Sequence, residues 1–398
     1  MLRLFNTMTK KKETFKPLKD KYVKIFVCGV TVYDYAHLGH ARTYAFYDTL
    51  VRFLRYLDYK VAYLQNVTDV GHLTEDTGED KIIKKAKEES KDPLEITNFY
   101  LNHWLEMMEK FKLQKPDLLP RATDHIKEII GQVQTILKNG YAYIANDSVY
   151  FDVSKFKDYG KLSKKVPKEL RPGARVELNT DKTDPHDFAL WIKASPEHIL
   201  RWNSPWCEWG YPGWHIEDTA IAIKHLGKQY DIHGGAIELA FPHHEAEIAQ
   251  AEATTGIKPY VKYWVHTGLL TINKQKMAKS LGNFVRLADA LEKYSPEVFR
   301  LWIASTHYRK PLDYNERDLD VAKKKLNKIS DTLERIKDNL KRAESGKPVF
   351  LTKLKKMEKK FLDAMQDDIN TPLALTHFFE IISFINKQID VNKYSKKD

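Results

Sequence analysis

Apolar positions near the start of the chain follow the pattern of a strand, a helix and a second strand. Residues 24–29 (KIFVCG) form a short apolar run closed by glycine, which predicts a buried strand. Residues 38–57 predict a helix, because their larger side chains recur three or four positions apart, namely Tyr44, Tyr47, Leu50, Val51 and Leu54. Residues 61–67 predict the second strand. This order indicates a parallel α/β sheet, whose ligands bind where its strands end.

The middle of the chain, from about residue 113 to 200, has a different pattern. Helical stretches are followed by residues 140–153 (GYAYIANDSVYFDV), which predict a β-hairpin, and by a lysine-rich stretch at 155–173. The α/β pattern then resumes from about residue 206 to 256. We therefore expect an inserted domain between two halves of the sheet.

From about residue 318 onward the pattern is helical. An apolar seam recurs at spacings of three and four on an otherwise charged helix, formed by Leu326, Ile329, Leu333, Ile336 and Leu340. Gly346 and Pro348 interrupt this helix, and residues 361–365 and 373–389 predict further helices. The pattern predicts a helical bundle. Its basic faces suit solvent, and also an RNA partner.

The composition narrows the possible classes of function. The chain has 398 residues, with 65 Lys and Arg against 54 Asp and Glu, which gives a net charge of +11. No apolar run approaches the roughly 18 residues needed to cross a bilayer, and the N-terminus lacks the apolar core of a secretory signal. Cys28 and Cys207 are too few for a disulfide framework. We exclude a membrane protein, a secreted scaffold and a fibre, and expect a cytoplasmic protein with a polyanionic partner.

Two short motifs could act on phosphates. The first, HLGH at 37–40, stands where the first helix begins, and the free N–H groups and partial positive charge of a helix start favour phosphate. The second, KMAKS at 276–280, places two lysines around a short loop, where they can follow the moving charge of a triphosphate. Each motif alone is weak, since histidines near helix starts are usually structural and lysines are abundant in this chain.

The pair of motifs resembles the HxGH and KMxKS signatures of class I aminoacyl-tRNA synthetases. Further strings are similar to the cysteinyl-tRNA synthetase family, namely CGVTVYD at 28–34, NVTD at 66–69, PGWHIE at 212–217, FPHHEAE at 241–247, HYRKPLDY at 307–314 and DDINTPLAL at 367–375. The resemblance extends from about residue 2 to the C-terminus. It implies an α/β fold with a Rossmann-like parallel-sheet catalytic domain, an inserted α+β domain and a C-terminal helical bundle.

This resemblance gives the expected domain bounds. Residues 1–112 and 201–256 form the two halves of the catalytic domain, 113–200 the inserted connective domain, 257–316 a linking domain with the KMxKS loop, and 317–398 a helical bundle for tRNA. In the family a small anticodon-reading domain follows the bundle, and we expect that this chain lacks it.

The resemblance also implies a reaction in two steps. The carboxylate of L-cysteine attacks the α-phosphate of ATP, which enters with Mg2+, and the terminal ribose of tRNA(Cys) then displaces AMP. His37 and His40 are expected to bind the phosphates, Gly39 to pack under adenine, and Lys276 and Lys279 to stabilise the transition state. On the adenosine side we expect the DIHGGAIEL string, with Gly234, Gly235 and Glu238. Ala278 replaces the usual serine of the KMxKS loop, at an expected modest cost in activity.

The resemblance implies one zinc ion per chain. In the family its ligands are a cysteine of CGxTVYD, a cysteine after WHIE, and the first His and second Glu of HHExE. These positions are Cys28, Asp218, His243 and Glu247 here, so an aspartate replaces one thiolate. Three alternatives stay open: zinc on these four residues, zinc with Cys207 recruited, or no structural metal.

Zinc would explain how cysteine is selected. A bound metal takes the substrate thiolate as a ligand, whereas the serine hydroxyl is a poor ligand at neutral pH. Gly29, Thr68 and Trp214 match residues of the family's amino-acid pocket, and packing in the core is the less favoured alternative for Trp214.

Two other functions compete with tRNA charging. A mycothiol-type cysteine ligase shares the adenylation motifs but joins cysteine to a sugar amine, and it needs no RNA surface. An inactive RNA-binding paralogue would not need both intact motifs. The basic charge favours tRNA as the partner. We expect a monomer, because no additional apolar seam is evident in the sequence.

Overall fold

A parallel sheet lies at the centre of the molecule. The computed structural model describes residues 1–70, 80–165, 181–213, 215–277 and 281–397. Within them the sheet has the order β10–β9–β3–β4, made by β3 (Tyr22–Thr31), β4 (Lys60–Thr68), β9 (Tyr230–Ala236) and β10 (Val261–Thr267), all parallel. Both strands predicted in the first 70 residues are confirmed. Cys28 lies within β3, beside a bulge between Val27 and Val30, rather than at its end.

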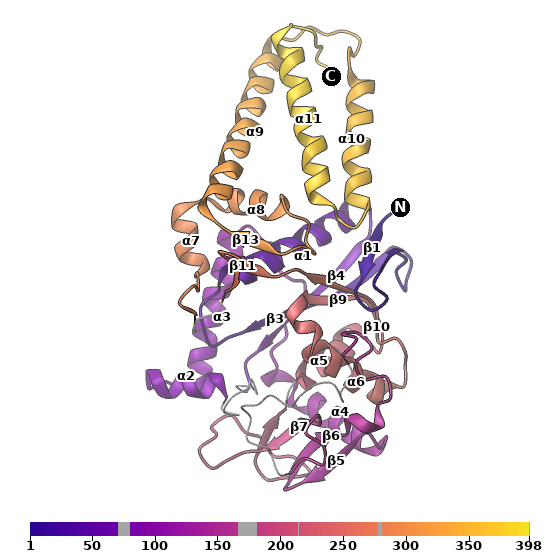
Figure 1. Ribbon diagram of the computed structural model, residues 1–398, viewed down its shortest axis with the longest axis vertical. Helices are drawn as coiled ribbons and strands as arrows, with labels where there is room; N and C mark the ends of the chain where they lie inside the picture. The colour runs from indigo at the N-terminus through magenta and orange to yellow at the C-terminus, as the bar shows by residue number, and fades with distance from the viewer. Residues whose placement is uncertain (71–79, 166–180, 214, 278–280, 398) are drawn as a thin grey trace.

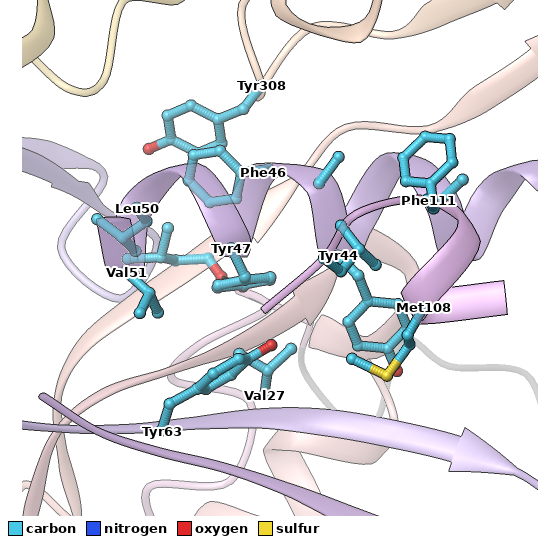
Figure 2. Packing of buried hydrophobic residues seen from close by; sticks show 14 of the residues in the cluster. Val27, Tyr44, Phe46, Tyr47, Leu50, Val51, Tyr63, Met108, Phe111 and Tyr308 are labelled. Carbon is cyan, nitrogen blue, oxygen red and sulfur yellow. Dashed lines mark hydrogen bonds between the residues drawn. The ribbon is translucent and has the colours of Figure 1, made fainter. Parts of the chain in front are cut away.

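Helices cover both faces of this sheet. On one face α1 (Leu38–Tyr56), the predicted first helix, packs Tyr44, Tyr47, Leu50 and Val51 against sheet residues such as Val27 (Figure 2). On the other face lie α5 (Ile216–Leu226) and α6 (His243–Thr255). The strand order reverses direction between β3 and β9, and the carboxyl ends of strands at such a point form a crevice suited to ligands.

The inserted region forms an antiparallel sheet at one end of the molecule (Figure 1). Its strands are β5 (Ala142–Ala145), β6 (Ser148–Phe151), β7 (Phe188–Lys193) and β8 (Gly210–Pro212), and α4 (Ile126–Lys138) links it to the parallel sheet. The hairpin predicted around residue 146 is confirmed. The strand β8 lies beyond residue 200, so the sheet of the insert includes residues that the sequence pattern assigned to the catalytic half.

Further strands and helices accompany the parallel sheet. They are β1 (Arg3–Asn6), β2 (Lys11–Thr14), α2 (Lys81–Glu89), α3 (Pro93–Lys110), β11 (Leu270–Ile272), β12 (Gln275–Lys276), α7 (Leu287–Lys293), α8 (Pro296–Ala304) and β13 (Leu312–Tyr314), with short 3-10 turns at Thr123–His125, Val153–Lys155 and Ile237–Ala240. No described helix is both long enough and apolar enough to span a membrane.

The predicted helical bundle forms the end opposite the insert (Figure 1). It consists of α9 (Glu316–Arg342), α10 (Leu351–Gln366) and α11 (Thr371–Asp390). The predicted seam of α9 is wrong in part, because Leu333 and Leu340 are half exposed while Thr332 is buried. A polar contact with α11 occupies the inward position instead, because the hydroxyl of Thr332 accepts a hydrogen bond of 2.7 Å from the side-chain amide of Asn386.

A loop of the insert contacts α2 through a histidine. His198 stacks on Tyr211 with ring centroids 3.9 Å apart, and its Nε2 lies 4.0 Å from a carboxylate oxygen of Asp80, the residue that caps α2. Burial lowers the pKa of His198 to about 4. The folded protein therefore holds this ring neutral at a pH where an unfolded chain protonates it.

The substitution His198→Phe is expected to flatten the dependence of stability on pH. Unfolded His198 binds a proton below about pH 6.5, whereas folded His198 binds one only near pH 4. Protonation therefore favours the unfolded chain between these values: the native stability is complete above pH 6.5, and part of it is lost as the pH falls toward 4. Between pH 7.5 and 5 the native chain should lose about 2 kcal/mol more unfolding free energy than the variant, whose ring still stacks but cannot titrate. Urea unfolding at the two pH values measures the difference, and equal losses would contradict the assignment.

Candidate active site and metal centre

The HxGH motif caps the N-terminus of α1. The Nδ1 atom of His37 accepts a hydrogen bond from the backbone N–H of Gly39 at 3.1 Å, and Nδ1 of His40 accepts one from the N–H of His37 at 3.2 Å. The two imidazole rings are stacked, with centroids 3.7 Å apart. A side chain at Gly39 would meet the His37 ring, at 2.9 Å from its Cβ. Both histidines therefore cap the start of α1, and each does so through its Nδ1 atom.

Burial keeps these two rings neutral. It lowers the pKa of His37 to about 4, and burial together with the adjacent His37 lowers the pKa of His40 well below its usual value. Because both Nδ1 atoms accept hydrogen bonds, the proton of each neutral ring lies on Nε2. Each ring thus has an Nε2–H group that can donate to a phosphate oxygen.

The segment around the second motif lies against the first. The backbone N–H of Leu38 donates to the carbonyl of Val285 at 3.2 Å, and that of Leu287 donates to Ala36 at 2.8 Å. The methyl group of Met277 lies 3.6 Å from the position that a Cβ of Gly39 would occupy. The structure therefore brings the two motifs together, although Ala278 and Lys279 lie outside the described residues.

Lys276 forms an ion pair with a residue that the sequence placed on the adenosine side. Its Nζ lies 2.5 Å from Oε1 of Glu238, and both side chains are largely exposed. Gly234 and Gly235 precede Glu238 at the end of β9. A Cβ at Gly234 would lie 1.7 Å from the carbonyl oxygen of Val265, so packing between strands requires glycine there. Roles of these residues in binding ATP stay predictions.

The four predicted metal ligands converge from three elements. Cys28 comes from β3, Asp218 from the first turn of α5, and His243 and Glu247 from α6. Their ligand atoms all lie within 4.8 Å of one another. The Nε2 atom of His243 is 3.4 Å from the Cys28 sulfur, 3.1 Å from an Asp218 oxygen and 2.8 Å from a Glu247 oxygen.

The electrostatics of this group suit a cation. Burial alone would lower the pKa of His233, but Glu247 and Cys28 raise it to about 10. In the same way, Cys28 and Glu247 overcome the effect of burial and raise the pKa of His243. Burial raises the pKa of Asp218. The buried negative charge thus retains protons on two histidines, and a divalent ion can satisfy the same charge. One thiolate, one imidazole and two carboxylates form a donor set that fits zinc.

Two further histidines surround the Cys28 sulfur, and the sequence analysis missed them. Nε2 of His244 lies 3.1 Å from the sulfur and Nε2 of His233 lies 3.5 Å from it, and with Glu247 they form a second group of four candidate ligands. His244 is also paired with His266 through a contact of 2.8 Å between ring nitrogens. His233 lies on β9, the strand paired with β3, and this position could have indicated that it lies near Cys28.

Asn66 connects the metal group to the predicted amino-acid pocket. Its side-chain oxygen accepts a hydrogen bond from the N–H of Gly29 at 2.7 Å, while its amide nitrogen donates to Thr68 at 3.0 Å and to a carboxylate oxygen of Asp218. A Cβ at Gly29 would collide with the Asn66 carbonyl oxygen, at 1.6 Å. Gly29, Thr68 and Asp218 are therefore held together, whereas Trp214 lies outside the described residues.

Cys207 belongs to the insert, away from this group. Its sulfur lies 3.4 Å from the hydroxyl of Ser204, and it packs against the apolar cluster that contains Trp191. Within the described part of the chain, both candidate metal groups contain Cys28 and neither contains Cys207. The alternative in which Cys207 is recruited has no support in this geometry.

Comparison with known families and proteins gives consistent matches. Residues 14–324 match the family model of the "tRNA synthetases class I (C) catalytic domain", and residues 360–398 match the "DALR domain". A protein named cysteine–tRNA ligase from Chlorobium chlorochromatii is 48% identical over 392 residues, which is 98% of this chain and 80% of the relative. One of the same name from Thermococcus kodakarensis is 49% identical over 394 residues, with the same coverage.

Solved structures share the fold at low sequence identity. A methionyl-tRNA synthetase from Mycobacterium tuberculosis superposes with a TM-score of 0.68 at 15% identity, covering 93% of this chain and 84% of that one. A leucyl-tRNA synthetase from Agrobacterium radiobacter gives 0.65 at 10% identity, covering 96% and 82%. The α/β catalytic fold with its C-terminal helices is thus shared with these enzymes.

Proposed function

The chain belongs to the cysteine–tRNA ligase family of class I synthetases, and from this premise we propose how its residues divide the work of joining cysteine to tRNA. The enzyme activates L-cysteine with ATP to cysteinyl-adenylate and transfers the cysteinyl group to the 3′ end of tRNA(Cys). The observation that carries this conclusion is an identity of 45–49% to cysteine–tRNA ligases over 98% of the chain or more.

In the activation step, the work of the protein is to position groups and stabilise charge. The Nε2–H groups of His37 and His40 donate to ATP phosphate oxygens, and Lys276 and Lys279 balance the charge that moves toward pyrophosphate. Lys276 must leave Glu238 to do so, and their exposed ion pair is worth at most about 1 kcal/mol. Gly39, Gly234, Gly235 and Glu238 form the adenosine side of this proposed site.

The amino-acid pocket lies one helical turn from the phosphate site. Tyr44 lies four residues after His40 on α1, and its hydroxyl donates a hydrogen bond of 2.7 Å to the backbone carbonyl of Cys28. We place the substrate side chain near Cys28, with Gly29, Thr68 and Trp214 around it. A zinc ion held by Cys28, Asp218, His243 and Glu247 would supply a ligand position for the substrate thiolate. Asn66 then orients Asp218 through its hydrogen bond, as residues behind metal ligands commonly do.

The remaining expectations form part of the same proposal. ATP enters with Mg2+, the tRNA contacts the basic helical bundle, and the enzyme is a cytoplasmic monomer. The five sequence-based domain bounds stay predictions.

Charging of tRNA tests this function directly. Purified protein is incubated with labelled cysteine, ATP, Mg2+ and total tRNA, and in parallel with an amino sugar acceptor. We expect label in tRNA, none on the sugar amine, and loss of charging after treatment with a zinc chelator. Label on the sugar amine alone would identify a mycothiol-type ligase. Absence of cysteine-dependent ATP–pyrophosphate exchange would leave an inactive paralogue.

A further inference from the structure

A buried carboxylate lies where the helical bundle meets the catalytic unit. Asp368, in the turn between α10 and α11, is 1% exposed, whereas the adjacent Asp367 has a side chain 42% exposed. Asp368 and Ile369 both have left-handed backbone conformations, with φ of 67° and 48°. Such conformations are unfavourable for residues other than glycine, so surrounding contacts must hold this turn in place.

Asp368 binds two other segments of the chain at once. One carboxylate oxygen accepts hydrogen bonds of 2.7 Å from the N–H of Phe5 in β1 and from the hydroxyl of Tyr308, and the other accepts one of 2.8 Å from Nε of Arg309. Its backbone N–H donates to the carbonyl of Arg3 at 2.9 Å. The N-terminal strand, the segment 307–310 and the base of the bundle therefore meet at one side chain.

The segment 307–310 is held from the opposite side by α1. The Arg42 guanidinium is 3% exposed and donates to the carbonyls of Leu269, Tyr308 and Lys310. Phe46, one turn further along α1, stacks on the Tyr308 ring with centroids 4.1 Å apart (Figure 2). Arg42 follows His40 by two residues, and Leu269 immediately precedes the hairpin that leads to the KMxKS loop. The segment 307–310 is thus held by α1 on one side and by Asp368 on the other, so it connects the catalytic unit with the base of the bundle.

Apolar contacts and hydrogen bonds together hold the base of the bundle against the catalytic unit. Met365, Ile369 and Ala374 at its base join the main core. Three pockets, of about 350, 440 and 360 Å3, lie along the junction of α10, the turn and the start of α11 with α1, α8 and residues 305–310. Apolar packing has little directional preference, so the directed hydrogen bonds of Asp368 contribute to the orientation of the bundle.

We infer that Asp368 is a positioning residue for the transfer step: its carboxylate fixes the bundle on the catalytic unit through Tyr308 and Arg309, so that bound tRNA presents its 3′ end to the adenylate. This inference rests on the proposed binding of tRNA by the bundle. Asp368 lies outside the proposed ATP and cysteine sites, so the activation step should not depend on it.

The test compares Asp368→Asn with Asp367→Asn. Asp367 is the matched control, because it pairs only at the surface, with Lys12 at 2.7 Å and Arg3 at 3.8 Å. We expect Asp368→Asn to lower kcat/KM for tRNA charging at least about tenfold, while cysteine-dependent ATP–pyrophosphate exchange stays within about twofold. Tyr308→Phe, a milder variant that removes one hydrogen bond, should show the same split with a smaller loss. Asp367→Asn should change neither activity.

A measurement without RNA accompanies the assays. In Asp368→Asn, hydrogen–deuterium exchange should quicken in residues 364–374 and 1–8 but not in β3 or α1. If Asp368→Asn loses pyrophosphate exchange and tRNA charging in parallel, the inference is overturned in favour of a general structural role. Unchanged tRNA charging would also overturn it. If the native enzyme exchanges pyrophosphate but does not charge tRNA, the proposed acceptor fails. The hydrogen–deuterium exchange of Asp368→Asn then decides whether Asp368 positions the bundle. An unchanged exchange pattern would overturn this positioning role too.

Discussion

Replacing Cys28 with serine is expected to lower cysteine-dependent ATP–pyrophosphate exchange at least about 1,000-fold and to leave less than about a tenth of a zinc ion per chain. Cys28 supplies the thiolate of both candidate ligand groups, with His243, His244 and His233 all within 3.5 Å of its sulfur. A serine hydroxyl stays protonated at neutral pH and binds zinc poorly. The measurements are pyrophosphate exchange and elemental analysis of protein purified without chelator.

Cys207→Ser is the matched control for this experiment. It makes the same atomic change in the insert, against Ser204, and should retain both zinc and exchange activity. Near-normal exchange by the Cys28 variant would contradict capture of the substrate by a metal at this position. Loss of zinc in the Cys207 variant would show that the described ligand group is incomplete.

The substitution His40→Ala is expected to reduce kcat for pyrophosphate exchange by about 100- to 1,000-fold, the usual cost of removing a donor to transition-state charge. Its Nδ1 caps α1 and its neutral ring carries the proton on Nε2, so both a cap and a phosphate donor are lost. Loss of the cap costs about 1 kcal/mol of stability. Thermal unfolding measures this loss of stability, and pyrophosphate exchange at saturating ATP measures the loss of kcat.

The control for His40→Ala is His377→Ala. His377 lies on α11 beside Glu380, within the bundle, so its removal should leave exchange unchanged. A His40 variant that keeps exchange within about threefold of native would assign the HxGH histidines to helix capping alone.

The sequence predicts the parts of the fold that depend on local patterns. Apolar runs such as residues 24–29 identify buried strands, and spacing along residues 38–57 identifies α1. The candidate metal group could be anticipated because the motif strings that resemble the family supply its four members.

Other features depend on three-dimensional proximity that no local pattern encodes. Leu333 and Leu340 fit an apolar repeat, yet the rotation of α9 against its neighbours leaves them half exposed. The ion pair between Lys276 and Glu238 joins segments 38 residues apart, and Asp368 meets Phe5, 363 residues before it, and Arg309, 59 residues before it. In DDINTPLAL, Asp367 and Asp368 are chemically identical, and only the fold buries the second.

The path of the chain from β8 into α5 has a consequence for the stability of the insert. Gly213, Trp214 and His215 alone separate the last strand of the inserted sheet from the helix whose first turn carries Asp218. A zinc ion held around Asp218, as proposed, would therefore also favour the folded insert, and by thermodynamic reciprocity an ordered insert would tighten the binding of zinc. If zinc binds there, melting of the inserted sheet and loss of zinc should follow a common cooperative transition.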